Sequence, residues 1–199
     1  MSARRSRFAL MAAVFALGLV VCLGLVVLLT RGLGGPEGTA GAAVGGSYRL
    51  TDQNGAPFSD DQLRGRPYLM FFGFTHCPDV CPTSLWEASE VLRALGPDAD
   101  RTAVIFVSVD PERDTPELLK TYLASFDPHI RGLTGTPEEI AAVAKKFRVY
   151  YKKIPLEDGD YTMDHTAIVY LMDKQGRFVA PFNIKRPPEQ AAADLRKYF

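Results

Sequence analysis

Two cysteines stand close together in a segment whose residue types could do chemistry. The segment is THCPDVCP at residues 75–82, and it contains Cys77 and Cys81. A spacing of four residues brings the two sulfurs onto one face of a helical turn, with the Cα atoms about 6 Å apart. A disulfide accepts that separation. Because the amides of a helix N-terminus favour thiolate over thiol, the pair is competent for redox chemistry, for metal binding, or for both.

The elements around the cysteines alternate between strand and helix. Residues 67–74 (PYLMFFGF) are continuously apolar, as expected of a central strand that is covered on both faces. After the cysteine loop, apolar side chains recur at steps of three and four until Gly96-Pro97, which predicts a helix. The other expected elements are a strand at 103–109, helices at about 115–126 and 136–147, a hairpin with strands at 166–172 and 178–182, and a final helix from about Pro188. This order predicts an α/β, thioredoxin-like fold in which helices flank a central mixed sheet.

Two additions to this core are expected. An extra N-terminal β-hairpin should run from 47–51 across Asn54-Gly55 to 57–58. A longer insertion, 149–164, lies before the C-terminal hairpin.

His165 is expected to reach the cysteines from a distant part of the chain. It directly precedes the segment 166–172, the first strand of the C-terminal hairpin. In this fold that strand runs antiparallel to the central strands, so its beginning should lie at their carboxyl ends, beside the cysteine loop. Asp110 and Asp164 are candidates to orient the imidazole of His165. A role in a turn or a helix cap is the alternative for both carboxylates.

Two thiolates and one imidazole form a soft, three-coordinate set of ligands. Such a set favours cuprous copper, whereas structural zinc normally takes four protein ligands. Cupric copper would need a further oxygen or nitrogen donor. An oxidised pair could not supply thiolates, so copper loading and disulfide formation should exclude each other.

Other functions remain open on the residues alone. A thiol–disulfide reductase would need only Cys77 and Cys81. A peroxiredoxin-like peroxidase is disfavoured because Thr75 lies two residues before Cys77, where that family places a threonine three residues before its reactive cysteine. A scaffold acting through surface contacts would need neither cysteine. The formal net charge of zero argues against a nucleic-acid partner. The other histidines, His76 and His129, and four lysines are interpreted as surface residues: Lys145, Lys146, Lys152 and Lys153.

The N-terminal segment differs in kind from the rest of the chain. Residues 8–30 are uncharged and mainly aliphatic, and as a helix they would rise about 34 Å, enough to cross a hydrocarbon core of about 30 Å. Arg4, Arg5 and Arg7 precede this run, so the positive-inside rule keeps residues 1–7 in the cytoplasm. We therefore expect a transmembrane anchor at 8–30, a flexible linker at 31–46 and an extracytoplasmic domain at 47–199. A cleaved signal peptide is the alternative, and Cys22 is interpreted as an apolar membrane residue.

The motifs together resemble the Sco/SenC family of cytochrome c oxidase assembly proteins. The matching segments are FGFTHCPDVCP at 72–82, SVDPERDTP at 108–116 and DHT at 164–166, where DHS is commoner in the family. The resemblance implies that Cys77, Cys81 and His165 bind copper, and that the partners are the copper-binding subunit of cytochrome c oxidase and an extracytoplasmic thiol reductant. It implies a single-pass protein of a bacterial cytoplasmic membrane. The family includes members implicated in copper delivery, in reduction of the oxidase cysteines and in redox signalling, and the motif does not separate these roles. Of these roles, we expect a metallochaperone rather than an enzyme.

Overall fold

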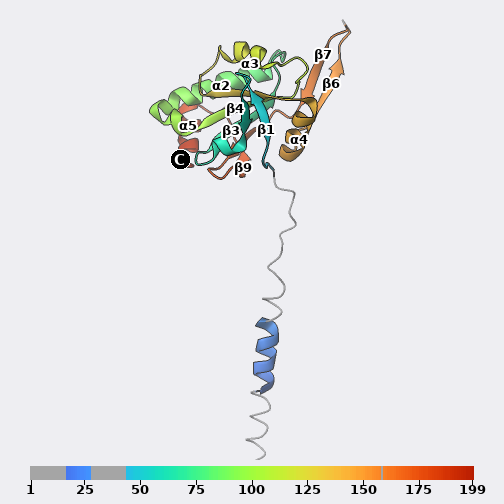
Figure 1. The fold of residues 1–199 in the computed structure, drawn as a ribbon. Helices are drawn as coiled ribbons and strands as arrows, with labels where there is room; N and C mark the ends of the chain where they lie inside the picture. The colour runs from blue at the N-terminus through green and yellow to red at the C-terminus, as the bar shows by residue number, and fades with distance from the viewer. Residues whose placement is uncertain (1–16, 28–43, 158) are drawn as a thin grey trace, which may run out of the picture. The chain divides into compact units, whose positions relative to one another are not determined.

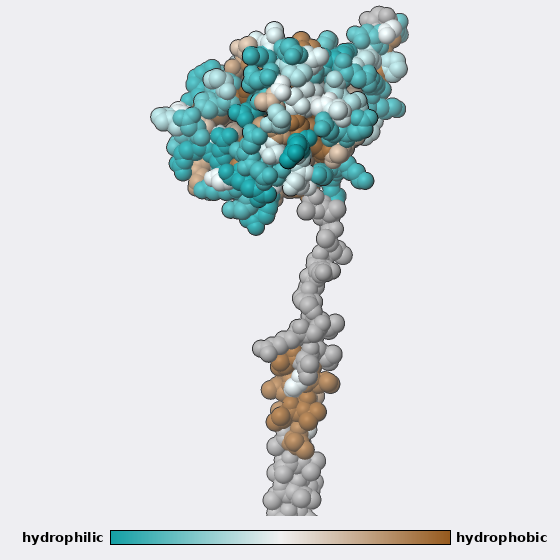
Figure 2. All heavy atoms as spheres, viewed as in Figure 1, coloured by the Kyte–Doolittle hydropathy of each residue, from teal (hydrophilic) through white to brown (hydrophobic). Residues whose placement is uncertain are grey.

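The structure is a computed structural model that describes residues 17–27, 44–157 and 159–199. The chain divides into two compact units, Met1–Ala42 and Ala43–Phe199. In the described part of the first unit, residues 17–27 form a helix with exposed apolar side chains, coloured brown in Figure 2. Cys22 is exposed on this helix. Within the described residues, no helix has the length and apolar character needed to cross a membrane. Most of the expected anchor at 8–30 and most of the expected linker lie outside the described residues.

The second unit is built on a seven-stranded mixed sheet in the order β2-β1-β5-β4-β3-β8-β9 (Figure 1). The three central strands β3, β4 and β5 are parallel, and the outer strands run antiparallel to their neighbours. The strands are β1 (Arg49–Asp52), β2 (Pro57–Ser59), β3 (Tyr68–Gly73), β4 (Ala103–Ser108), β5 (Ile130–Thr134), β8 (Val169–Met172) and β9 (Phe178–Pro181).

Helices cover both faces of this sheet. They are α2 (Val80–Leu95), α3 (Pro116–Leu123), α4 (Pro137–Phe147) and α5 (Pro188–Arg196), with short 3-10 helices η1 (Asp60–Leu63) and η2 (Gly96–Arg101). Successive residues of a strand face opposite ways, and β3 shows this clearly. Phe72 packs against Phe147 of α4, whereas Phe71 faces the other side and packs against Phe106, which in turn contacts Tyr122 of α3. Every residue of β3 and β4 is buried, as the unbroken apolar runs predict.

The expected mixed sheet with flanking helices is confirmed, and so is the N-terminal hairpin formed by β1 and β2. One central strand was not expected from the sequence. Strand β5 (IRGLT) is short and interrupted by Arg131 and Gly132, so it lacks the continuous apolar run of its neighbours. It nevertheless pairs with β4 on one side and β1 on the other.

The insertion before the C-terminal hairpin forms a small sheet of its own. Strands β6 (Tyr151–Pro155) and β7 (Tyr161–His165) pair antiparallel and extend from the body of the domain (Figure 1). The expectation that His165 directly precedes the first strand of the C-terminal hairpin is therefore wrong. His165 ends β7, where it pairs with Tyr151, and β8 begins only at Val169.

Candidate metal centre

The cysteine loop connects the carboxyl end of β3 to the first turn of α2. Cys77 lies in the loop, where its amide donates to the carbonyl of Phe74 at 3.3 Å, and Cys81 lies on the helix. The amide of Cys81 donates to Sγ of Cys77 at 3.4 Å, so the helix N-terminus points at this sulfur. Both cysteines are free thiols; Cys81 is fully buried, and 9% of Cys77 is exposed.

A glycine makes room for the buried sulfur. A Cβ atom at Gly73, the last residue of β3, would lie 2.7 Å from Sγ of Cys81 and 2.7 Å from the ring of Phe106. Carbon and sulfur atoms in ordinary contact stand well over 3 Å apart, so only glycine fits here without displacing Cys81.

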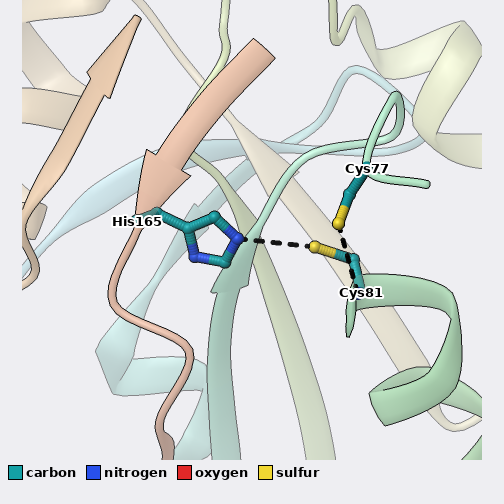
Figure 3. Close-up of side chains that lie close together, drawn as sticks. All are labelled: Cys77, Cys81 and His165. Carbon is teal, nitrogen blue, oxygen red and sulfur yellow. Dashed lines mark hydrogen bonds between the residues drawn. The ribbon is translucent and has the colours of Figure 1, made fainter. Parts of the chain in front are cut away.

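His165 reaches the cysteines from the end of β7, as Figure 3 shows. Its Nε2 lies 3.6 Å from Sγ of Cys81, and its Nδ1 lies 3.1 Å from the carbonyl oxygen of Thr166. Because a carbonyl only accepts hydrogen bonds, Nδ1 carries the ring proton and the lone pair of Nε2 faces the sulfur. Phe71 and Phe74 contact the imidazole edge to face and hold the plane of the ring.

The three side chains form a group with the dimensions of a metal site. Sγ of Cys77, Sγ of Cys81 and one ring nitrogen of His165 all lie within 4.8 Å of one another. In a planar three-coordinate site, an ion lies about 2.3 Å from each sulfur and about 2.0 Å from the nitrogen. The three ligand atoms then stand roughly 4 Å from one another. The group could thus close on an ion through small side-chain movements.

Burial favours the uncharged forms of Cys81 and His165. It raises the pKa of the Cys81 thiol and lowers the pKa of the His165 imidazole. The sequence led us to expect that the helix N-terminus would favour thiolate, but at Cys81 the loss of hydration outweighs that effect. A bound cation would displace the thiol proton and provide the missing counter-charge.

A buried carboxylate that the sequence analysis did not single out fixes the start of the cysteine loop. Asp114 accepts hydrogen bonds from the amide of Thr75 at 3.1 Å, from the hydroxyl of Thr75 at 2.6 Å and from the hydroxyl of Ser108 at 2.6 Å. Burial raises the pKa of Asp114, against the lowering effect of these donors. Thr75 lies two residues before Cys77, so Asp114 ties the cysteine loop to the segment that follows β4.

Asp110 fastens the hairpin that carries His165. It accepts a hydrogen bond from the hydroxyl of Tyr161 in β7 at 2.9 Å and forms an ion pair with Arg113 at 2.5 Å. The guanidinium of Arg113 stacks 3.8 Å above the ring of Tyr161 and donates to its carbonyl at 2.9 Å. Asp110 therefore acts on the position of β7 as a whole.

The expected contact of Asp110 or Asp164 with the imidazole is not what the structure shows. Asp164 is exposed because it alternates with His165 along β7 and faces the opposite side of the strand. The partner of Nδ1 is the carbonyl of Thr166. A backbone carbonyl leaves no signal in a sequence, whereas the roles of Arg113 and Asp114 could have been suspected from the unusual density of polar residues in SVDPERDTP.

The remaining histidines and the lysines are not part of this group. His76 is exposed and contacts the hydroxyl of Thr75 at 3.0 Å. His129 lies between Asp127 and Asp100, with ring nitrogen distances of 2.7 and 3.1 Å. The four lysines are exposed: Lys145, Lys146, Lys152 and Lys153. Lys153 pairs with Glu112, and Lys146 donates to the carbonyl of Ser47.

Comparison with known proteins identifies the family. The SCO1/SenC family matches residues 36–199. A SCO2-like protein of Rickettsia felis is 40% identical over 155 residues, covering 77% of this chain and 76% of the relative. The structure of Bradyrhizobium japonicum ScoI with copper bound is 66% identical and covers 79% of this chain and 100% of that one, with a TM-score of 0.77.

A more distant neighbour carries further information. BsSco, whose structure is described with a disulfide switch and as a member of the Sco family of cytochrome c oxidase assembly proteins, is 26% identical, covering 79% of this chain and 94% of its own, with a TM-score of 0.64. The family match and the identity to the Rickettsia protein together show that this chain belongs to the SCO1/SenC family.

Proposed function

We propose that this member of the SCO1/SenC family is a copper carrier that binds one copper ion through Cys77, Cys81 and His165. The convergence of two thiols and an imidazole within 4.8 Å, from two elements far apart in the chain, carries the proposal. Soft sulfur ligands and a neutral imidazole suit cuprous copper, and cupric copper would require an added oxygen or nitrogen donor. Copper in the 66% identical structure supports the choice of metal.

We propose that the recipient is the copper-binding subunit of cytochrome c oxidase. BsSco, a relative with the same fold, is a member of the Sco family of cytochrome c oxidase assembly proteins. A carrier with only three protein ligands leaves a coordination position open to an incoming cysteine or histidine of the recipient. Copper could then pass by stepwise ligand exchange, without ever being released as a hydrated ion.

The N-terminal residues would hold the carrier at the membrane. We propose an anchor at 8–30, with residues 1–7 in the cytoplasm, a linker at 31–46 and the copper-binding domain at 47–199 on the extracytoplasmic side of a bacterial membrane. The apolar side chains exposed on the helix at 17–27 support an anchor, because such a surface is costly in water and stable in lipid. Deletion of residues 1–43 should move the protein from the membrane fraction to the soluble fraction.

A thiol–disulfide reductase is the second candidate, favoured by the two free thiols and by the disulfide switch identified in BsSco. Cys77 would attack a disulfide of the recipient, because Cys81 is fully buried. This attack frees one recipient thiol and leaves the other recipient sulfur bound to Cys77 in a mixed disulfide. Cys81 would then attack the Cys77 sulfur and displace that second recipient thiol, so the recipient gains two electrons and two protons while Cys77 and Cys81 form a disulfide. An extracytoplasmic thiol reductant would restore the dithiol.

One experiment separates the two candidates. The full chain in detergent is reduced, loaded with one Cu(I) and mixed with the reduced copper-binding domain of an oxidase subunit, and copper transfer is followed. The metal-free reduced chain is mixed in parallel with the oxidised subunit, and appearance of thiols is followed. The carrier proposal expects His165→Ala to abolish transfer and His76→Ala to leave it intact. Thiol reduction that is fast, and transfer that does not depend on His165, would favour the reductase.

A further inference from the structure

A pocket lies at the opposite end of the central strands from the cysteines. Ala103 and Ile130, the first residues of β4 and β5, line it, as does Arg66, two residues before β3 begins. The pocket has a volume of about 330 Å³. Strand β4 has six residues, and at about 3.3 Å per residue it separates this pocket from the cysteine end of the sheet by roughly 20 Å.

Two arginines in this pocket have no carboxylate partner among the described residues. Arg66 and Arg131 are both half-buried. Neighbouring arginines outside the pocket are paired, Arg64 with Asp61 at 2.8 Å and Arg101 with Asp98 at 3.2 Å. Partly buried guanidinium groups are costly to leave without a negative partner, so this pair is ready to receive an anion.

The guanidinium of Arg131 is held in place by an aromatic ring. Arg131 is a residue of β5, and its guanidinium lies 5.1 Å above the ring of Phe58, which is buried in β2. Stacking on an aromatic ring leaves the edge of the guanidinium, with its N–H groups, free to bind an oxyanion.

The other polar groups of the pocket also point to an anion. The side-chain oxygen of Gln53 accepts a hydrogen bond from the amide of Gly132 at 2.8 Å, so its NH2 group remains as a donor. Among the described residues, no aspartate or glutamate lines the pocket. His129 lines it as well, and its ring contacts the carboxylates of Asp127 and Asp100.

We propose that this pocket binds the phosphate or carboxylate group of a small soluble anion between Arg66 and Arg131. The planar fork of N–H donors in each guanidinium matches two oxygens of such a group. The volume is at the lower end of the range for small-molecule pockets and fits an anion of a few heavy atoms. Because the pocket is far from the cysteines, the bound anion does not contact copper.

The test uses the reduced, copper-free full chain in detergent, with inorganic phosphate and citrate as probes. Each probe is titrated at constant ionic strength, with chloride as the replaced anion, and binding is measured by calorimetry and by the unfolding midpoint. At least one anion should bind saturably and raise the midpoint. Arg66→Gln and Arg131→Gln should each weaken binding about tenfold or more. The phosphate and citrate titrations distinguish the two sources of the oxyanion.

The matched control is Arg49→Gln, which removes the same charge from an exposed position of β1. It should leave anion affinity unchanged. No saturable binding of either anion would overturn the proposal, and so would an equal loss of affinity in Arg49→Gln and Arg66→Gln. Since Arg131 also packs on Phe58, Arg66→Gln decides the outcome if Arg131→Gln fails to fold. Copper affinity should be the same in Arg66→Gln as in the parent chain.

Discussion

Replacing Gly73 by alanine should disturb the metal site through a single methyl group. The added Cβ would lie 2.7 Å from Sγ of Cys81 and 2.7 Å from Cε2 of Phe106, whereas ordinary contacts need about 3.5–4.0 Å. Both the sulfur and the ring must therefore move away from the new methyl group, each by about 1 Å. Overpacking of a buried site costs about 1–3 kcal/mol, and we expect the higher part of that range because two neighbours are crowded at once. Loss of sulfur geometry should lower Cu(I) affinity by about 10- to 100-fold, as for changes that misplace a ligand.

Gly132→Ala is the matched control for this change. Its Cβ would lie 2.6 Å from Cδ1 of Leu123, the far end of a flexible side chain in α3. It should destabilise the domain by about 1 kcal/mol and leave Cu(I) affinity unaltered. Urea unfolding measures the first quantity, and competition with a chromophoric Cu(I) chelator measures the second. If Gly73→Ala binds copper as tightly as Gly132→Ala does, the proposed contact between β3 and the Cys81 sulfur has no role in metal binding.

Three further perturbations test the surroundings of the site. Tyr161→Phe removes the hydrogen bond to buried Asp110. Urea unfolding should therefore show a loss of about 1–3 kcal/mol in the free energy of unfolding, and chelator competition should show a weaker Cu(I) affinity. Tyr150→Phe, at an exposed position, should change neither quantity. Burial raises the pKa of the Cys81 thiol, so Cu(I) binding must release the thiol proton. Cu(I) affinity should therefore rise at least tenfold per pH unit between about pH 6 and 8. An affinity that does not change with pH would mean that this thiol is already ionised. The hydrogen bond that the His129 ring donates to Asp127 raises the pKa of His129. The stabilising effect of protonated His129 is therefore complete below the unfolded pKa of about 6.5 and is lost as pH rises through the folded value. Urea unfolding should therefore show a larger loss for His129→Gln at pH 5.5 than at pH 8.

Apolar patterning was enough to predict most of the fold. The unbroken runs that became β3 and β4 are buried on both faces, and the Thr-Pro-Glu starts of α3 and α4 form real N-caps, with the side chains of Thr115 and Thr136 accepting backbone amides. Strand β5 escaped prediction because Arg131 and Gly132 break its apolar pattern. Hydrogen bonding to β4 and β1 compensates for the weak strand propensity of β5. Such pairing with distant parts of the chain cannot be inferred from the five residues of β5 alone.

The candidate site was predictable in its residues and less so in its supports. We could predict from the sequence that the three side chains lie close together. The prediction used the spacing of Cys77 and Cys81 and the position of His165 near an antiparallel strand. Topology alone could not place His165 at the end of β7, because the strands of the insertion pair with each other. The contacts of Tyr161 with Asp110 and Arg113 then hold β7 against the segment that follows β4. The imidazole is oriented by the backbone carbonyl of Thr166. Every residue type has a backbone carbonyl, so no pattern of side chains predicts this contact.

The most direct test is the Cu(I) affinity of the reduced full chain and of His165→Ala, measured by chelator competition beside His76→Ala. If two thiols and the imidazole together hold the ion, the parent chain and His76→Ala bind one Cu(I) tightly, and His165→Ala binds it at least about tenfold more weakly. Equal affinity in all three proteins would mean that the imidazole is not a ligand and that the chain acts through its cysteines alone.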